Sequence, residues 1–241
     1  MPEFQTHALV NTYNDYPTLP LALDSLRGVV DSIIVADGAY QKYYDTYRRH
    51  EPDAKPWSTD GTLDIIRALE PNLPPVKLIE CPDGQPWVNQ TVKRSVLLDA
   101  VPDKDWFIIL DSDEMLYGNV VGGVNEVMGS GCIAGCMPLF NPGLDMNGLL
   151  PFWHPRIFLK LPGMYYERKH WLLCDFAHRV IEHTYPLWMT NQCVMAHFKV
   201  FRNMRRLAPH MSYMLDMSKH GWQEPQTSLF KSETDDKGGD M

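Results

Sequence analysis

The amino-acid sequence predicts an α/β fold in which a mostly parallel sheet is flanked by helices. Through the first half of the chain, short apolar runs of strand length alternate with segments that carry apolar residues at helical spacing. Each interval between successive runs is long enough for a helix that crosses over the sheet. With 241 residues and 44% apolar content, the chain can bury the core of one large domain. We therefore expect a single domain over residues 1–225.

Four strands and three helices are expected in the first half, residues 1–117. The expected strands are short runs rich in Val, Ile and Leu, and the expected helices repeat apolar residues at every third or fourth position. In the second helix, Leu63, Ile66 and Leu69 share one face. The expected strands are residues 7–12, 32–36, 76–80 and 106–110, and the expected helices are residues 19–26, 62–69 and 88–100.

The second half, residues 118–225, has a weaker pattern and is expected to form a smaller extension. Asn, Pro and Gly residues between 141 and 151 predict a loop, and residues 156–160 and 195–200 are typical of strands. The last residues are polar and charged and cannot bury enough apolar surface to fold. We therefore expect a disordered tail over residues 226–241.

Charge and hydropathy exclude several classes of protein. The formal net charge of -8 argues against a protein that coats nucleic acid or an anionic membrane by bulk electrostatics. No run reaches the roughly 18 to 20 apolar residues that span a bilayer, and the first residues lack the features of a secretion signal, so we expect a soluble cytoplasmic protein. The five cysteines are scattered, as expected of reduced thiols. Cys132 and Cys136 are interpreted either as core thiols or as half of a metal site.

The acidic segment 111–114, Asp-Ser-Asp-Glu, is the strongest signal for chemistry, because it follows the apolar run 106–110 directly. In open α/β sheets, ligands bind beyond the carboxyl ends of the strands. Asp111 and Asp113 can together reach one hard divalent cation, Mg²⁺ or Mn²⁺, which neutralises a diphosphate leaving group. A solvated acidic turn is the alternative, but the position after a buried strand favours a metal site.

Four segments together resemble the family 2-like glycosyltransferases of GT-A fold. These segments are LVNTYND at 9–15, IIVADG at 33–38, STDGT at 58–62 and WFIILDSDE at 106–114, and they follow the order seen in that family. The resemblance is good over the first half of the chain and loose over the second. It implies a nucleotide-sugar-binding half at residues 1–117 and an acceptor-side half at 118–225.

The same resemblance implies the reaction. A sugar would move from a nucleotide-sugar, for which a UDP-sugar is expected, to an acceptor hydroxyl. The acceptor is left open among a glycan, a lipid-linked sugar, a protein and a modified DNA base. Thr12, Tyr13 and Asp37 would contact the base and ribose, since a carboxylate can accept from a ring N–H or a ribose hydroxyl. For Asp37, a plain strand-ending turn is the alternative.

Three further residues are expected at the donor site through the resemblance. Lys93 and Arg94 would lie beside the diphosphate, unless they form an exposed helix face. Ser112 lies between the two aspartates of the metal-binding segment. The sequence also departs from the family by an insertion at residues 39–57, which is either a lid or acceptor platform or a surface excursion.

The second half supplies candidates for the remaining roles. His197 is similar to a late-strand residue that provides a third metal ligand, and an imidazole beside two carboxylates suits Mn²⁺; a core histidine is the alternative. Segment 165–171 resembles one with a His-Glu pair near the reacting sugar, but Trp171 stands where the Glu is expected. Glu167 and Asp175 remain candidate catalytic carboxylates, with ordinary polar roles as the alternative, and whether the enzyme inverts or retains is left open.

Two other classes of function compete with glycosyl transfer. A nucleotidyltransferase also needs a carboxylate-bound metal at a strand end, but it should show a glycine-rich basic loop after the first strand, and residues 11–15 contain none. A non-catalytic nucleotide-sugar or glycan-binding module would keep the fold without turnover. A dehydrogenase is disfavoured, because no Gly-x-Gly-x-x-Gly follows any expected strand.

Overall fold

The computed structural model describes residues 4–141, 152–167, 172–198 and 212. The expected tail at 226–241, most of the expected loop around 142–151 and residues 199–200 of the expected last strand lie outside these residues. None of the helices in the described part of the chain is long and apolar enough to cross a membrane.

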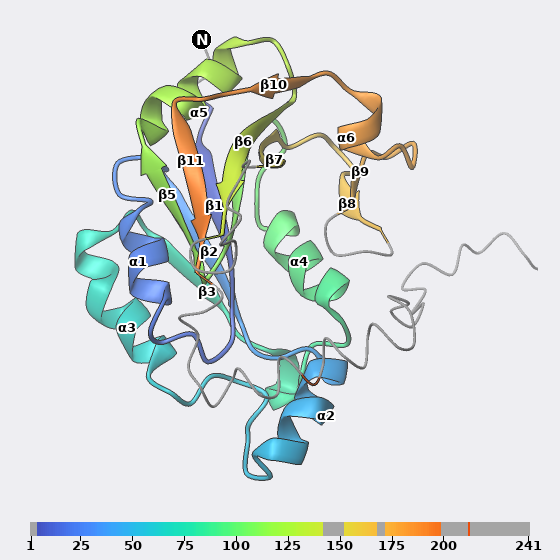
Figure 1. Ribbon diagram of the computed structural model, residues 1–241. Coiled ribbons are helices and arrows are strands. Elements are labelled where there is room, and N and C mark those ends of the chain that lie inside the picture. Colours follow the sequence, from blue (N-terminus) through green and yellow to red (C-terminus); the bar gives the residue numbers. More distant parts are fainter. Residues whose placement is uncertain (1–3, 142–151, 168–171, 199–211, 213–241) are drawn as a thin grey trace, which may run out of the picture.

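Among the described residues, a mixed sheet of nine strands, most of whose pairings are parallel, forms the centre of the molecule (Figure 1). Its strand order is β3-β2-β1-β4-β7-β6-β11-β5, and β10 pairs with β6. The strands of this sheet are β1 (Thr6–Thr12), β2 (Ser32–Asp37), β3 (Val76–Ile79), β4 (Trp106–Asp111), β5 (Glu114–Gly118), β6 (Ala134–Phe140), β7 (Phe152–Leu159), β10 (Leu187–Met189) and β11 (Cys193–His197). A separate antiparallel pair is formed by β8 (Tyr165–Tyr166) and β9 (Leu173–Cys174).

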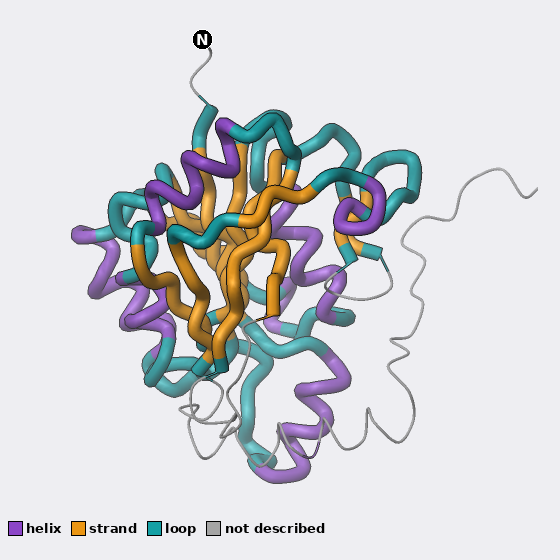
Figure 2. The backbone as a smooth tube through the Cα atoms, turned by 45° about the horizontal axis from the view of Figure 1, so that its top comes forward, coloured by secondary structure: helices purple, strands orange, loops and turns teal. Residues whose placement is uncertain are grey.

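Helices cover both faces of the sheet (Figure 2). Within the described part of the chain, the α-helices are α1 (Leu19–Asp24), α2 (Gln41–His50), α3 (Thr62–Leu69), α4 (Gln90–Asp99), α5 (Val120–Gly129) and α6 (Ile181–Thr184), and the 3-10 turns are η1 (Glu70–Asn72) and η2 (Pro82–Gly84). Helices α1, α3 and α5 pack on one face and share an apolar core with alternate residues of the strands. On the other face, α4, α6 and the β8–β9 pair enclose a second core.

The expected strands and helices of the first half are all present, with ends that differ by a few residues. The central strand β1 buries both faces, because parallel strands inside such a sheet are covered by helices on each side. Helix α4 begins at Gln90 rather than at 88, because the Asn89 side chain caps it by accepting a hydrogen bond from the Val92 amide at 2.8 Å. Helix α1 ends at Asp24, two residues before the expected end.

The insertion at 39–57 carries helix α2, which lies at the end of the molecule where β1 and β2 finish (Figure 1). Tyr43 and Tyr47 of α2 pack edge-on against Tyr13, with ring centroids 6.0 and 5.7 Å away. The insertion is therefore anchored to the loop after β1 through a tyrosine cluster, and it is not a detached surface excursion.

The topology brings several strand ends to one edge of the sheet. Strands β1, β2 and β4 are parallel neighbours, with Thr12 opposite Asp37 and Asn11 opposite Asp111. Strand β7 is antiparallel to both β4 and β6, and β6 is parallel to β11. The carboxyl end of β11, at His197, therefore lies at the same edge as the end of β4.

Candidate functional site

The acidic segment 111–114 forms a tight turn between β4 and β5 at this edge. Strand β5 returns antiparallel to β11, with Glu114 opposite His197. The Phe198 amide donates to the Asp113 carbonyl at 2.7 Å. The turn is thus fixed directly to the end of the late strand that carries the expected third ligand.

Asp113 and His197 face each other across this turn. His197 Nε2 lies 3.3 Å from Asp113 Oδ2. Both residues are buried. Two ligands that each lie about 2.1 Å from one ion at right angles are about 3 Å apart, so the spacing fits two ligands of a single cation. A carboxylate beside an imidazole is also a donor set that Mn²⁺ accepts.

Asp111, the other expected ligand, is held by an arginine. Arg94 donates to Asp111 Oδ1 at 2.6 Å. Burial disfavours the charge of Asp111, but Arg94 and Arg156 outweigh it and lower the pKa of the carboxyl to about 2. Within the described part of the chain, no three His, Cys, Asp or Glu side chains are grouped as a ready metal cluster. The structure therefore brings together Asp113 and His197 and keeps Asp111 in an ion pair beside them.

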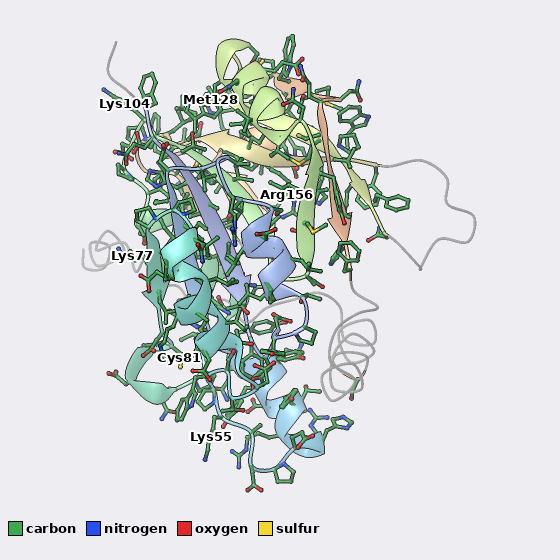
Figure 3. The ribbon with its side chains drawn as sticks, turned by 90° about the vertical axis from the view of Figure 1, so that its left-hand side faces the viewer. Lys55, Lys77, Cys81, Lys104, Met128 and Arg156 are labelled. Carbon is green, nitrogen blue, oxygen red and sulfur yellow. The ribbon has the colours of Figure 1, made fainter. Side chains whose placement is uncertain are left out.

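Glu114 has a supporting position beneath the turn. One of its oxygens accepts from the Asp111 amide at 2.8 Å, and the other accepts from Arg156 at 2.5 Å. Burial raises the pKa of Glu114, and the charge of Arg156 opposes this shift. Figure 3 labels Arg156, which lies inside the molecule at the level of the sheet. The pair ties the turn to β7.

Asp37 lies at the end of β2, where a ribose contact was expected, but its side chain is turned into the protein. Its side chain is completely buried, and its two oxygens accept from the Ser58 amide at 2.9 Å and from the Ser58 hydroxyl. Burial raises the pKa of Asp37, while Lys93 and the Ser58 hydrogen bonds oppose the shift. Because the insertion returns to the sheet at Ser58, these contacts make Asp37 the anchor of that return.

Lys93 is also buried, which contradicts the alternative of an exposed helix face. Its ammonium donates to the Thr12 carbonyl at 2.7 Å and to the Gly38 carbonyl at 2.5 Å. Burial lowers the pKa of Lys93 to about 7, although Asp37 opposes the shift. Arg94 is buried as well. Lys93 therefore joins the ends of β1 and β2, and of the two basic residues only Arg94 reaches the acidic turn.

The side chains of Thr12, Tyr13 and Ser112 also point inward. Each is at most 3% exposed. The Tyr13 hydroxyl donates to the Lys55 carbonyl at 2.8 Å, and Figure 3 shows Lys55 at the α2 end of the molecule. The Thr12 and Ser112 hydroxyls both donate to Asp15. These three side chains therefore make hydrogen bonds inside the protein at this edge of the sheet.

The two candidate catalytic carboxylates differ in their surroundings. The buried Asp175 accepts hydrogen bonds from Arg179 and from the Tyr185 hydroxyl, the latter at 2.7 Å. Burial opposes the charge of Asp175, but these hydrogen bonds lower its pKa, so the carboxylate is a poor proton acceptor. Glu167 is half-buried, directly follows β8, and accepts a 3.6 Å contact from the Cys174 thiol. Of the two, Glu167 is the one that remains a candidate base.

Several other residues of the sequence predictions lie elsewhere. Trp171 lies outside the described residues. Cys136 is buried in β6, and all five cysteines are free thiols, with Cys132 half-buried before that strand. Neither cysteine belongs to a metal cluster in the described part of the chain.

Three residues at this edge escaped the sequence analysis. Asp15 binds Ser112, Arg156 pairs with Glu114, and His154 is half-buried on β7, where burial and Arg156 lower its pKa to about 4. A charged residue inside an apolar strand was the available signal for Arg156, because such a residue needs a buried partner. For Asp15, the available signal was its place three residues after a strand end.

Comparisons with known proteins identify the fold. No protein-family model matches the chain, and no curated protein sequence is similar to it. The structure superimposes on the crystal structure of S. aureus TarS 1-349 with a TM-score of 0.53 and 12% identity, covering 94% of this chain and 76% of that one. The chain has a GT-A-type fold. At this identity, the similarity establishes the fold and not the reaction.

Two further solved structures show a lower structural similarity to the chain. A lower similarity connects the chain to glucosyl-3-phosphoglycerate synthase from Mycobacterium tuberculosis in complex with Mn²⁺, UDP and glucosyl-3-phosphoglycerate, with a TM-score of 0.38, 17% identity, and coverage of 58% of this chain and 45% of that one. Another connects it to 4-diphosphocytidyl-2C-methyl-D-erythritol synthase, with a TM-score of 0.42, 10% identity, and coverage of 89% and 99%.

Proposed function

We propose that this protein is a metal-dependent glycosyltransferase that moves a sugar from a nucleotide-sugar, with UDP as the nucleotide, to an acceptor hydroxyl. The observation that carries the proposal is the pairing of Asp113 with His197 at 3.3 Å. These side chains come from two distant segments, and they meet at the sheet edge where open α/β folds bind ligands. Neither segment needs this contact to complete its strand.

Asp113 and His197 would hold the cation, and Asp111 would join them from the same turn. When bound, a divalent cation neutralises the charge of the departing diphosphate. Arg94 adds a fixed positive charge beside Asp111, and a charge that needs no rearrangement during the reaction stabilises a developing anion best. Glu167 is the candidate that would accept the acceptor proton if the enzyme inverts.

Nucleotidyl transfer is the competing reaction, since it uses the same metal chemistry at the same edge. The two reactions release different products. A glycosyltransferase releases a nucleoside diphosphate from a nucleotide-sugar, whereas a nucleotidyltransferase releases pyrophosphate from a nucleoside triphosphate. Release of UDP from UDP-sugars with Mn²⁺, and no pyrophosphate from UTP or CTP with a sugar phosphate, is the expected result.

Binding can be tested without knowledge of the acceptor. We expect UDP with Mn²⁺ to raise the melting temperature more than either alone, because a ligand that binds only the folded state stabilises it. At a ligand concentration about 100 times the dissociation constant, the shift should be roughly 5 to 10 °C. GDP, CDP, ADP and dTDP serve as comparisons. Equal melting temperatures with and without every nucleotide would reject a nucleotide-dependent transferase.

His197→Ala should weaken Mn²⁺ binding in the presence of UDP by about tenfold or more. Removing an outer-shell partner of a metal ligand already costs about 10- to 100-fold, and His197 would itself be a ligand. The matched control is His183→Ala, which removes an exposed histidine of α6. Titration calorimetry with both variants checks the prediction. Wild-type affinity in a folded His197→Ala protein would show that His197 is a core histidine.

A further inference from the structure

A buried carboxylate, Asp15, connects the loop after β1 to the turn that carries Asp111 and Asp113. Asp15 is 2% exposed. Its Oδ2 accepts the Ser112 hydroxyl from the middle of the turn, and the same oxygen accepts the Tyr13 amide at 3.1 Å. One oxygen therefore holds two loops that come from different strands.

Asp15 is itself firmly placed. Its amide donates to the Thr62 hydroxyl at 2.9 Å, at the start of α3. Its carbonyl accepts from the amides of Thr18 and Leu19, where α1 begins. The backbone of Asp15 is thus fixed to the beginnings of two helices.

Each residue of the acidic turn from Asp111 to Asp113 has its own hydrogen-bond partners. At its first residue, the Asp111 amide donates to Glu114 at 2.8 Å, and at its third, the Asp113 carbonyl accepts from the Phe198 amide at 2.7 Å. At its second residue, the Ser112 amide donates to the Asn11 carbonyl at 3.2 Å, and the Ser112 hydroxyl donates to Asp15. A turn whose central hydroxyl is bound by a buried carboxyl group has less freedom to rotate its own aspartate side chains.

We propose that Asp15 is a positioning residue that fixes the acidic turn through Ser112 and so keeps Asp113 facing His197 for the cation. This inference rests on the proposed function. Metal ligands must be held within about 0.5 Å of their working geometry, and hydrogen-bond partners outside the ligand set supply that restraint.

Two substitutions cut this connection at opposite ends. Asp15→Asn removes the charge of the acceptor, and Ser112→Ala removes only the donor. We expect each substitution to raise the dissociation constant of Mn²⁺ by about tenfold. The constant is measured with saturating UDP from the paramagnetic resonance signal of free Mn²⁺. The double variant should lose no more than the larger single loss, because both changes remove one interaction. Ser112→Ala carries the test if Asp15→Asn does not fold.

The control removes a carboxylate of the same kind elsewhere in the molecule. Glu126 on α5 accepts the Thr190 hydroxyl at 2.7 Å, so Glu126→Gln changes a similar hydrogen bond away from the acidic turn. Its Mn²⁺ affinity should equal that of the wild type. A wild type that binds no Mn²⁺ with UDP would overturn the proposed function, and this inference with it. A wild type that binds Mn²⁺, with both variants binding it equally well even if they melt earlier, would overturn the role of Asp15 alone.

Discussion

Asp113→Asn is expected to lower Mn²⁺-dependent release of UDP from the donor by more than about 100-fold while leaving the protein folded. The amide has the size of the carboxylate, so the buried packing is kept, but the charged ligand opposite His197 is lost. Loss of an outer-shell partner costs about 10- to 100-fold, and loss of a charged ligand should exceed that range. Initial rates of UDP release at several Mn²⁺ concentrations provide the measurement.

The comparison for this variant is Asp103→Asn, which removes an exposed carboxylate before β4 and should leave the rate unchanged. Circular dichroism and the melting temperature of both variants establish that they are folded. If Asp113→Asn turned over donor at the wild-type rate with saturating Mn²⁺, Asp113 would hold no catalytic cation, and the proposed reaction would lose its main support.

Local pattern was sufficient to predict the first half of the fold. The buried strands of a parallel sheet appear as continuous apolar runs, and the helices between them have a visible period, so each element is encoded in its own segment. The acidic turn after β4 was predicted on the same basis, because it follows such a run. The match to the GT-A-type fold confirms this class of architecture.

The second half depends on contacts between distant segments, which a single sequence does not display. The antiparallel pairing of β5 with β11 places His197 opposite Glu114. Strand β5 is only five residues long and follows the acidic turn at once, so its sequence reads as part of a loop. His197 was proposed as a ligand from the resemblance alone, and its distance from Asp113 comes from this pairing.

Side-chain direction at the strand ends was the least predictable feature of the candidate site. Asp37 and Lys93 stand where a nucleoside and a diphosphate contact were expected, yet both are buried. Their direction depends on Ser58, which the insertion at 39–57 brings back to the sheet, and on the packing of α4 against β1 and β2. The sequence alone does not distinguish a charged residue at a strand end that faces a ligand from one that binds a neighbouring loop.

The buried charged residues at this edge therefore have two different roles, one in binding and one in stabilising the fold. Asp113 and Asp111 lie at the turn where we propose that a cation binds. Lys93 and Asp37 form a scaffold behind it, because their charges satisfy carbonyls and amides of the loops. Substituting a residue of the scaffold should lower the stability of the fold rather than the rate of the reaction. Lys93 offers the sharpest test.

Lys93→Met is expected to reduce the free energy of unfolding by about 3 kcal/mol at neutral pH. The side chain keeps its length, but the Gly38 carbonyl loses the donor at 2.5 Å and Asp37 loses its neighbouring cation. Leaving a buried acceptor unsatisfied costs about 1 to 3 kcal/mol, and removing one partner of a buried charge pair adds to that. Urea denaturation measures the change, and Lys77→Met, at an exposed position of β3, is the control.

The pH dependence of this loss distinguishes Lys93 from an ordinary core residue. Burial lowers the pKa of Lys93 from 10.5 to about 7, so between these values the unfolded chain binds a proton that the folded protein has released. Stability supplied by this group therefore rises with pH through that window, by at most about 1.4 kcal/mol per pH unit. Between about pH 7.5 and about pH 9, the difference between wild type and Lys93→Met should grow by about 2 kcal/mol. A difference that stays constant over this range would mean that the ammonium keeps its proton between the Thr12 and Gly38 carbonyls, and that Asp37 compensates the cost of its burial in full.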